Sequence, residues 1–159
     1  MESINETVGH TAGKTEEAIQ HLRNHIEELG VKATELCQQH FDRVMAENKL
    51  KSWDDKSVLF VQTRVRGNSL TANWYVIGWY GSKTAKTRRM TKRLIAKQKG
   101  DYGYNMAVLR KLAKHWEMDM IESIEPKLSE IRRRVFLVNK AIISLNHLLR
   151  ITSVRLKIK

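Results

Sequence analysis

Two long apolar seams at helical spacing enclose a β-rich segment, and this order constrains the fold more than any other feature of the chain. In residues 14–50, apolar side chains recur in steps of three and four, which predicts one long helix. A second seam with the same spacing runs from Leu109 to Leu149. Because the β-rich segment lies between the seams, we expect the helices to pack as an antiparallel helical hairpin with the sheet at one end.

The ends of the helical regions carry local signals. Thr15 is placed to cap the first helix, and residues 1–13 contain little apolar material, so they are predicted to be a mobile leader. Asn105 is placed to cap the second region. Pro126 falls within the second seam, so either the helix kinks near Glu125 or a new helix begins with proline at its first position. Residues 151–159 are predicted to be a basic tail.

Residues 56–66 and 71–80 predict a β-hairpin. Both segments are rich in β-branched and aromatic residues, and Gly67-Asn68-Ser69 lies in the connection. Alternation predicts a core face that is nearly all apolar: Leu59, Val61, Thr63, Val65, Ala72, Trp74, Val76 and Tyr80. The other face is apolar at its base and polar towards the turn: Val58, Phe60, Ile77 and Trp79, then Gln62, Arg64, Arg66, Asn73 and Tyr75.

Residues 88–97 fit two interpretations. Met90, Leu94 and Ala96 alternate with Arg89, Thr91, Arg93 and Lys97, which is typical of a third antiparallel strand with a basic outer face. Met90 and Leu94 also stand at helical spacing, so a basic helix is the alternative. We favour the strand. The predicted fold class is α+β, with a small antiparallel β-meander of two or three strands flanked by long N- and C-terminal helices, in a single domain over residues 1–159.

Positive charge is concentrated in the middle of the chain. The net charge is +12 over 159 residues, and residues 51–100 alone carry twelve bases and two acids. Residues 82–99 hold eight Lys or Arg and no acid. A field of one sign favours an anionic partner, of which nucleic acid is the commonest. No run approaches the roughly 18 apolar residues that a membrane span needs, so we expect a cytoplasmic protein with no membrane partner.

The basic β-segment supplies the candidate contacts to double-stranded DNA. Arginine forks suit phosphates and guanine edges, asparagine can read adenine, and a two-stranded ribbon can enter a major groove. The expected main contacts are Arg64, Arg66, Arg89 and Arg93. The expected phosphate contacts are Lys83, Lys86, Arg88, Lys92 and Lys97, and the candidates for base or sugar contact are Asn73 and Tyr75. The alternative is a solvated strand edge whose charges only discourage aggregation.

Catalytic and metal-binding patterns are weak. Tyr102 and Tyr104 raise the question of a tyrosine nucleophile that cleaves DNA, but the usual relaxases also need a metal held by a histidine cluster. His21 and His25 share a helix face without a third ligand nearby, and Cys37 reads as a small packed hydrophobe. We therefore expect no enzyme, no metal and no cofactor. We expect a core position for Trp116 and solvated positions for Arg132-Arg133-Arg134.

Three segments resemble the MobI-like conjugative mobilisation proteins: WYVIGWYGSK, TKRLIAKQKGDYGYNM and LAKHWEMDMIESIEPKLSEIRRRV. The resemblance covers about residues 73–135. It implies a relaxosome accessory factor that binds origin-of-transfer DNA and helps a separate relaxase. The helical seams and the basic segment are also compatible with two other functions. The seams could serve a protein-interaction module that binds partner helices or forms a homodimer, and the basic face could serve an RNA-binding regulator.

Overall fold

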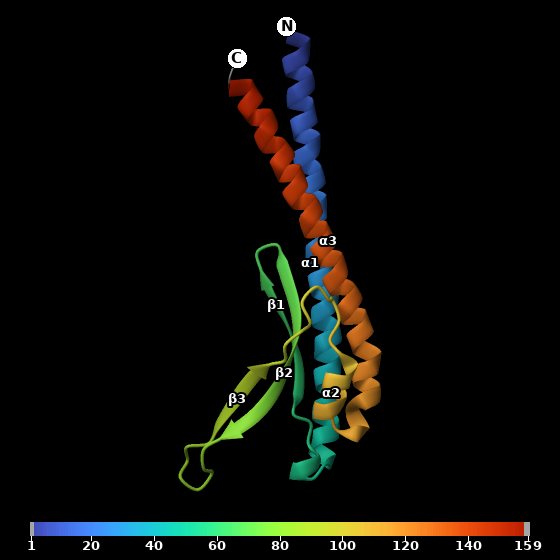
Figure 1. Ribbon diagram of the computed structural model, residues 1–159, viewed down its shortest axis with the longest axis vertical. Helices are drawn as coiled ribbons and strands as arrows, with labels where there is room; N and C mark the ends of the chain where they lie inside the picture. Colours follow the sequence, from blue (N-terminus) through green and yellow to red (C-terminus); the bar gives the residue numbers. More distant parts are fainter. Residues whose placement is uncertain (1, 158–159) are drawn as a thin grey trace.

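The protein is a pair of long helices with a three-stranded sheet packed beside them (Figure 1). The computed structural model describes the backbone of residues 2–157 and the side chains of residues 9–153. Helix α1 spans Glu2–Leu50, α2 spans Met106–Leu112 and α3 spans Met118–Lys157. The strands are β1 (Leu59–Arg66), β2 (Ser69–Tyr80) and β3 (Arg89–Leu94). Short 3-10 helices at Trp53–Asp55 and His115–Glu117 complete the chain. The predicted α+β class is confirmed.

Helices α1 and α3 run antiparallel, so both ends of the chain lie at the same end of the hairpin (Figure 1). Their apolar seams meet each other and one face of the sheet, and burial of this apolar surface stabilises the fold. The predicted seams are confirmed by their largely buried members. These include Ile19, Ile26, Leu29, Ala33, Leu109, Ile124, Leu128, Ile131, Val135 and Ile142.

The sheet is an antiparallel meander of order β1-β2-β3. The hairpin and the third strand are both confirmed, and the helical alternative for residues 88–97 is wrong. On the core face Leu59, Val61 and Trp74 are buried against the helices. Val65 and Tyr80 were also expected there, yet they are 59% and 75% exposed because they lie at strand ends.

Helix α1 begins earlier than its sequence signals predict. The hydroxyl of Thr15 donates to the carbonyl of Thr11 at 2.9 Å, so Thr15 lies inside the helix and does not cap it. Residues 2–13 contain no proline, and Gly9 and Gly13 are tolerated within the helix. The mobility of the leader stays a prediction. At the other end α3 continues to Lys157 through most of the expected tail; residues 158–159 lie outside the described part of the chain.

The second helical region breaks before its proline. The side-chain oxygen of Asn105 accepts a hydrogen bond from the amide of Ala107 at 2.9 Å, which confirms the predicted cap. The chain leaves helix α2 after Leu112 and enters α3 at Met118, so Pro126 lies within α3 and does not start a helix. Trp116 lies in this break. It is only partly buried, and its indole N–H donates to the carbonyl of Asp55 at 2.8 Å.

Of the described residues, one helical stretch, His115–Ser153, is long and apolar enough to cross a membrane by length and composition alone. Core helices of soluble proteins pass the same test. A single helix of this kind, identified by length and composition alone, is weak evidence for a membrane segment.

Candidate nucleic-acid interface

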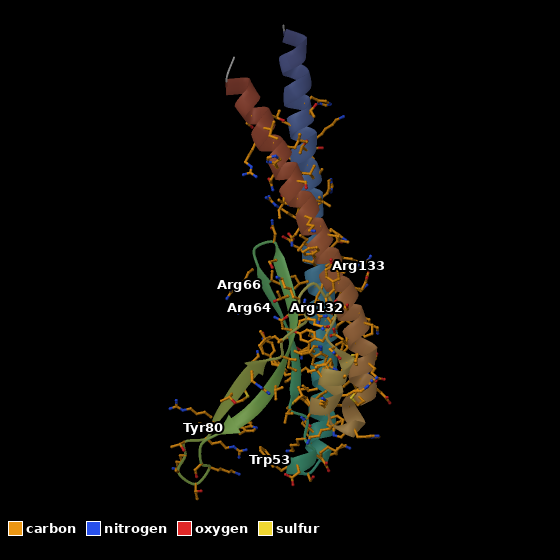
Figure 2. All side chains as sticks on the ribbon, viewed as in Figure 1. Trp53, Arg64, Arg66, Tyr80, Arg132 and Arg133 are labelled. Carbon is orange, nitrogen blue, oxygen red and sulfur yellow. The ribbon has the colours of Figure 1, made fainter. Side chains whose placement is uncertain are left out.

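The sheet has an outer face, opposite to the face that carries Leu59, Val61 and Trp74. Strand register places Phe60, Gln62, Arg64 and Arg66 of β1 on this face, opposite Tyr75, Asn73, Thr71 and Ser69 of β2. Lys92 of β3 pairs with Ile77 on the same face. Figure 2 shows Arg64 and Arg66 projecting away from the helices near the β1–β2 turn. The outer face is therefore basic along β1 and continues across β2 to Lys92.

The β2–β3 arm, residues 76–93, extends away from the helices (Figure 1). Arg93 pairs with Val76 and Arg89 pairs with Tyr80, so both arginines lie on the face opposite to Arg64 and Arg66. The expectation of one shared basic surface is wrong for these two residues. Alternation within β3 was read correctly, but the pairing with β2 decides which side faces the core. The arm therefore carries cations on both faces, with Lys83 and Lys86 in the loop at its tip.

The cations of residues 82–99 form no ion pairs among the described residues. Within the described part of the chain, none of these eight Lys or Arg side chains lies within 4.0 Å of a carboxylate oxygen in an ion pair. By contrast, Arg133 and Arg134 on α3 both pair with Glu130. The charge of the arm is thus available to an external anion, whereas part of the charge on α3 is already neutralised.

Two predicted phosphate contacts are stacked on aromatic rings. The guanidinium of Arg88 lies 4.5 Å from the ring centre of Trp53 and 4.7 Å from that of Trp79. The ammonium of Lys92 lies 4.1 Å from the ring centre of Tyr75 and also donates to Gln62. Such cation–π contacts hold long basic side chains in place. Sequence reasoning missed Trp53 because it lies in a short 3-10 helix, where the alternation of a strand does not apply.

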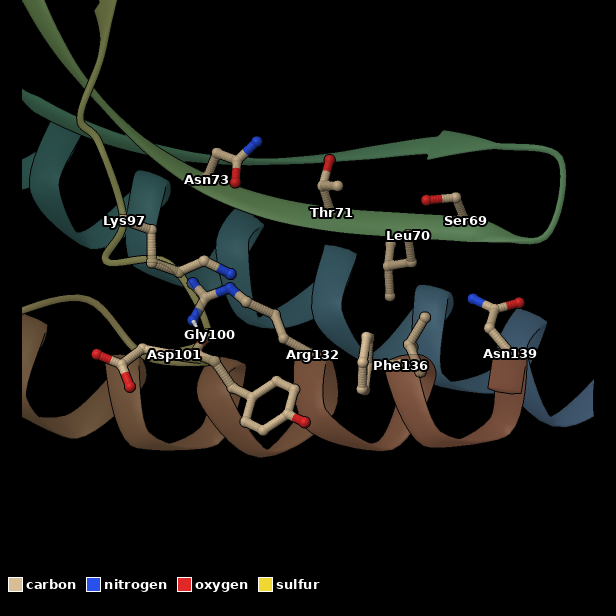
Figure 3. A pocket seen from close by; sticks show the side chains of 12 residues that line it. Ser69, Leu70, Thr71, Asn73, Lys97, Gly100, Asp101, Arg132, Phe136 and Asn139 are labelled. Carbon is tan, nitrogen blue, oxygen red and sulfur yellow. Dashed lines mark hydrogen bonds between the residues drawn. The ribbon is translucent and has the colours of Figure 1, made fainter. Parts of the chain in front are cut away.

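Asn73 and Lys97 line a separate cleft of about 340 Å³ between β2, residues 97–102 and α3 (Figure 3). The side-chain oxygen of Asn73 accepts a hydrogen bond from the Tyr104 hydroxyl at 3.2 Å. The Lys97 ammonium points towards the Arg132 guanidinium (Figure 3). Partial burial, and next the charge of Arg132, lower the pKa of Lys97. These two predicted contacts therefore stand apart from the arm.

A buried polar network fastens the sheet to α3. The carboxylate of Glu125 accepts from the Trp74 indole at 2.6 Å, from the Tyr104 amide at 2.8 Å, and from two nitrogens of Arg132 at 2.8 and 3.1 Å. Arg132 also donates to the carbonyl of Ala72 on β2 at 2.7 Å. Hence Arg132 is a buried anchor, and its expected solvated position is wrong.

Tyr104 and Cys37 both lie in the core. Burial raises the pKa of the Tyr104 phenol, which keeps it protonated, and the ring is almost fully covered. Burial likewise raises the pKa of the Cys37 thiol to about 11, and the predicted packing role of Cys37 is confirmed. Among the described residues no three His, Cys, Asp or Glu side chains gather as metal ligands.

A protein-family model described as MobI protein matches residues 29–146, about three quarters of the chain. The chain belongs to the MobI family. The resemblance seen in the sequence is thereby confirmed, and MobI membership implies an accessory role in conjugative mobilisation. MobI is an accessory family and not a known enzyme family. The matched region contains the whole sheet and the Glu125–Arg132 network. Neither the curated proteins nor the solved structures contain a significant match to this MobI chain.

Proposed function

We propose that this MobI-family protein binds double-stranded DNA at the origin of transfer and assists a separate relaxase in the cytoplasm. The observation that carries the proposal is the β2–β3 arm, a narrow two-stranded ribbon with unpaired cations on both faces and at its tip. The coarser role, accessory protein in mobilisation, follows from the family.

The two-faced charge of the arm suits a groove. A major groove is about 12 Å wide and admits a two-stranded ribbon, and it has a phosphate backbone along each wall. In this pose Arg89 and Arg93 approach one backbone, and Arg88 and Lys92 on the other side of the ribbon approach the second. Lys83 and Lys86 lie at the leading end. The outer-face pair Arg64 and Arg66 then contacts DNA beyond the groove.

The remaining predicted contacts keep smaller roles. Tyr75 lies beside Lys92 on the outer face, and we expect its hydroxyl to contact a phosphate or sugar. Asn73 retains its amide donors although Tyr104 occupies its oxygen. Lys97 adds positive charge at the rim of the cleft.

A salt titration tests the proposal. The double variant Arg89→Ala/Arg93→Ala removes two unpaired cations, and Arg133→Ala/Arg134→Ala is the matched control because it removes two arginines from α3. Figure 2 places Arg133 on the side of α3 away from the sheet. We expect the first variant to reduce the slope of log affinity against log salt by about 2, and the control to leave the slope unchanged.

Equal slopes for the arm variant and the wild type would refute the proposed face.

The absence of any duplex binding at moderate salt would instead favour a protein-interaction module. Exposed apolar side chains on α3, such as Leu137, Ile143 and Leu148, support that second candidate, since helical surfaces of this kind mediate self-association or partner binding. If the protein binds duplex DNA, selection of bound genomic fragments tests its sequence specificity. The expected result is enrichment of a single intergenic locus.

A further inference from the structure

The outer face ends in a group of aromatic rings, the aromatic cluster: Phe60, Tyr75, Trp79 and Trp53. We propose that this cluster binds the unpaired bases of single-stranded DNA. The inference rests on the proposed function and extends it, because the protein would then hold a locally opened strand beside the duplex that the arm contacts. Stacking platforms beside basic grooves are the general means of holding single strands.

Both tryptophans of the cluster remain open to solvent. Trp53 is 58% exposed and Trp79 is 54% exposed, even with the Arg88 guanidinium lying over both rings. Large aromatic side chains usually bury most of their surface, and contiguous apolar exposure marks an interaction site. Arg88 therefore occupies only part of each ring system and leaves room for a further planar group.

The geometry of the two indoles suits separate bases. Their centres lie 6.3 Å apart and their planes are inclined by 48°, so the rings do not stack on each other. Each ring can receive its own base on its open surface. In intact duplex DNA the faces of interior bases are covered by neighbouring base pairs and are not available for such contacts. Open indole faces consequently point to unpaired bases as the ligand.

Charge favours a polyanion over an apolar peptide at this site. Lys92 lies over Tyr75 and lies 5.0 Å from the ring centre of Phe60, while Lys56 lies 5.8 Å from the ring centre of Trp53. The acids nearest in sequence, Asp54 and Asp55, lie in the 3-10 helix that carries Trp53. The Asp55 carboxylate accepts from Ser52. Residues 51–100 contain twelve Lys or Arg and only these two acids.

The competing explanation is a purely structural role, in which the cluster only braces the arm. Trp53 comes from the segment after α1, whereas Trp79 and Arg88 belong to the arm, so their contact joins two parts of the fold. A brace would affect every ligand of the arm equally. A stacking platform would affect single strands selectively, and the experiment must separate these effects.

The test compares a single-stranded thymidine oligonucleotide with a duplex of equal length at one moderate salt concentration. The variants are Trp79→Ala, Trp53→Ala and the conservative Trp79→Phe. Phe136→Ala is the matched control, because Phe136 is 43% exposed on α3 and carries its own stacked cation, Lys140, at 4.6 Å. Unchanged circular dichroism and melting temperature verify that each variant folds.

We expect Trp79→Ala and Trp53→Ala each to weaken single-strand binding by about 5-fold to 150-fold, the range for one lost base stack. Duplex affinity should change by less than about 2-fold, Trp79→Phe should retain most single-strand binding, and Phe136→Ala should match the wild type. Equal loss on both ligands would identify a brace and overturn the proposal, as would unchanged single-strand binding. Wild-type protein that binds duplex but no single strand would overturn this inference alone, whereas binding to neither would overturn the proposed function as well.

Discussion

Buried His40 makes the stability of the fold depend on pH. Its ring on α1 is 5% exposed and meets the Trp74 ring edge-on, with centres 5.3 Å apart. Its buried Nε2 has no hydrogen-bond partner among the described atoms. Burial, and next the charge of Arg43, lower the pKa of His40 to about 4 from its usual 6.5. Protonation of His40 is therefore less favourable in the folded protein than in the unfolded chain.

The sign and size of the effect follow from this difference. The pKa of His40 is depressed in the folded state, so its contribution to the free energy of unfolding is present above about pH 6.5 and is lost as the pH falls towards about 4. Over the interval from about pH 7 to pH 5, the loss is about 2 kcal/mol. Burial raises the pKa of Glu117, whose contribution has the opposite sign and is lost as the pH rises. The wild-type curve includes both effects.

The variant His40→Phe isolates the histidine. Phenylalanine has a similar ring, needs no hydrogen bond and cannot titrate, while Glu117 is unchanged in both proteins. Urea denaturation at a series of pH values gives the free energy of unfolding for each. We expect the variant to gain about 2 kcal/mol relative to the wild type between about pH 7 and pH 5. Parallel curves for the two proteins would refute the assignment of the acid sensitivity to His40.

Two further variants probe the fold. Arg132→Leu leaves the Glu125 carboxylate buried without its counter-charge, and we expect the free energy of unfolding to fall by about 3–5 kcal/mol in urea denaturation; a loss below about 1 kcal/mol would contradict the anchoring role. Asn105→Ala removes the cap of α2, for which we expect a loss of about 1 kcal/mol by the same measurement. A stability equal to that of the wild type would show that the cap is dispensable.

The parts of the fold that could be predicted from the sequence are those governed by local periodicity. The spacing of Ile19, Ile26 and Ala33 follows the helical repeat, and the alternation around Val61 and Trp74 follows the pleat of a strand. The Asn105 cap is a contact within one turn. In each case the spacing that gives the signal lies between near neighbours in the chain, so it is visible without knowledge of the packing partner.

The parts that could not be predicted depend on contacts between distant segments. Arg132 resembles its neighbours Arg133 and Arg134 in sequence, yet it alone faces Glu125 and the carbonyl of Ala72 on another element. The side of the sheet occupied by Arg93 depends on its pairing with Val76. Trp53 joins the interface only because the chain folds back beside the arm. None of these positions has a local pattern that distinguishes it.

The length of the helical hairpin separates the two ends of the molecule. At 1.5 Å of rise per residue, the 49 residues of α1 extend for about 74 Å. The sheet lies beside the half of this rod that is distant from the termini (Figure 1). A partner held at the opposite end would therefore stand clear of anything seated on the strands, and removal of whole heptads from both helices would shorten that reach without touching the strands.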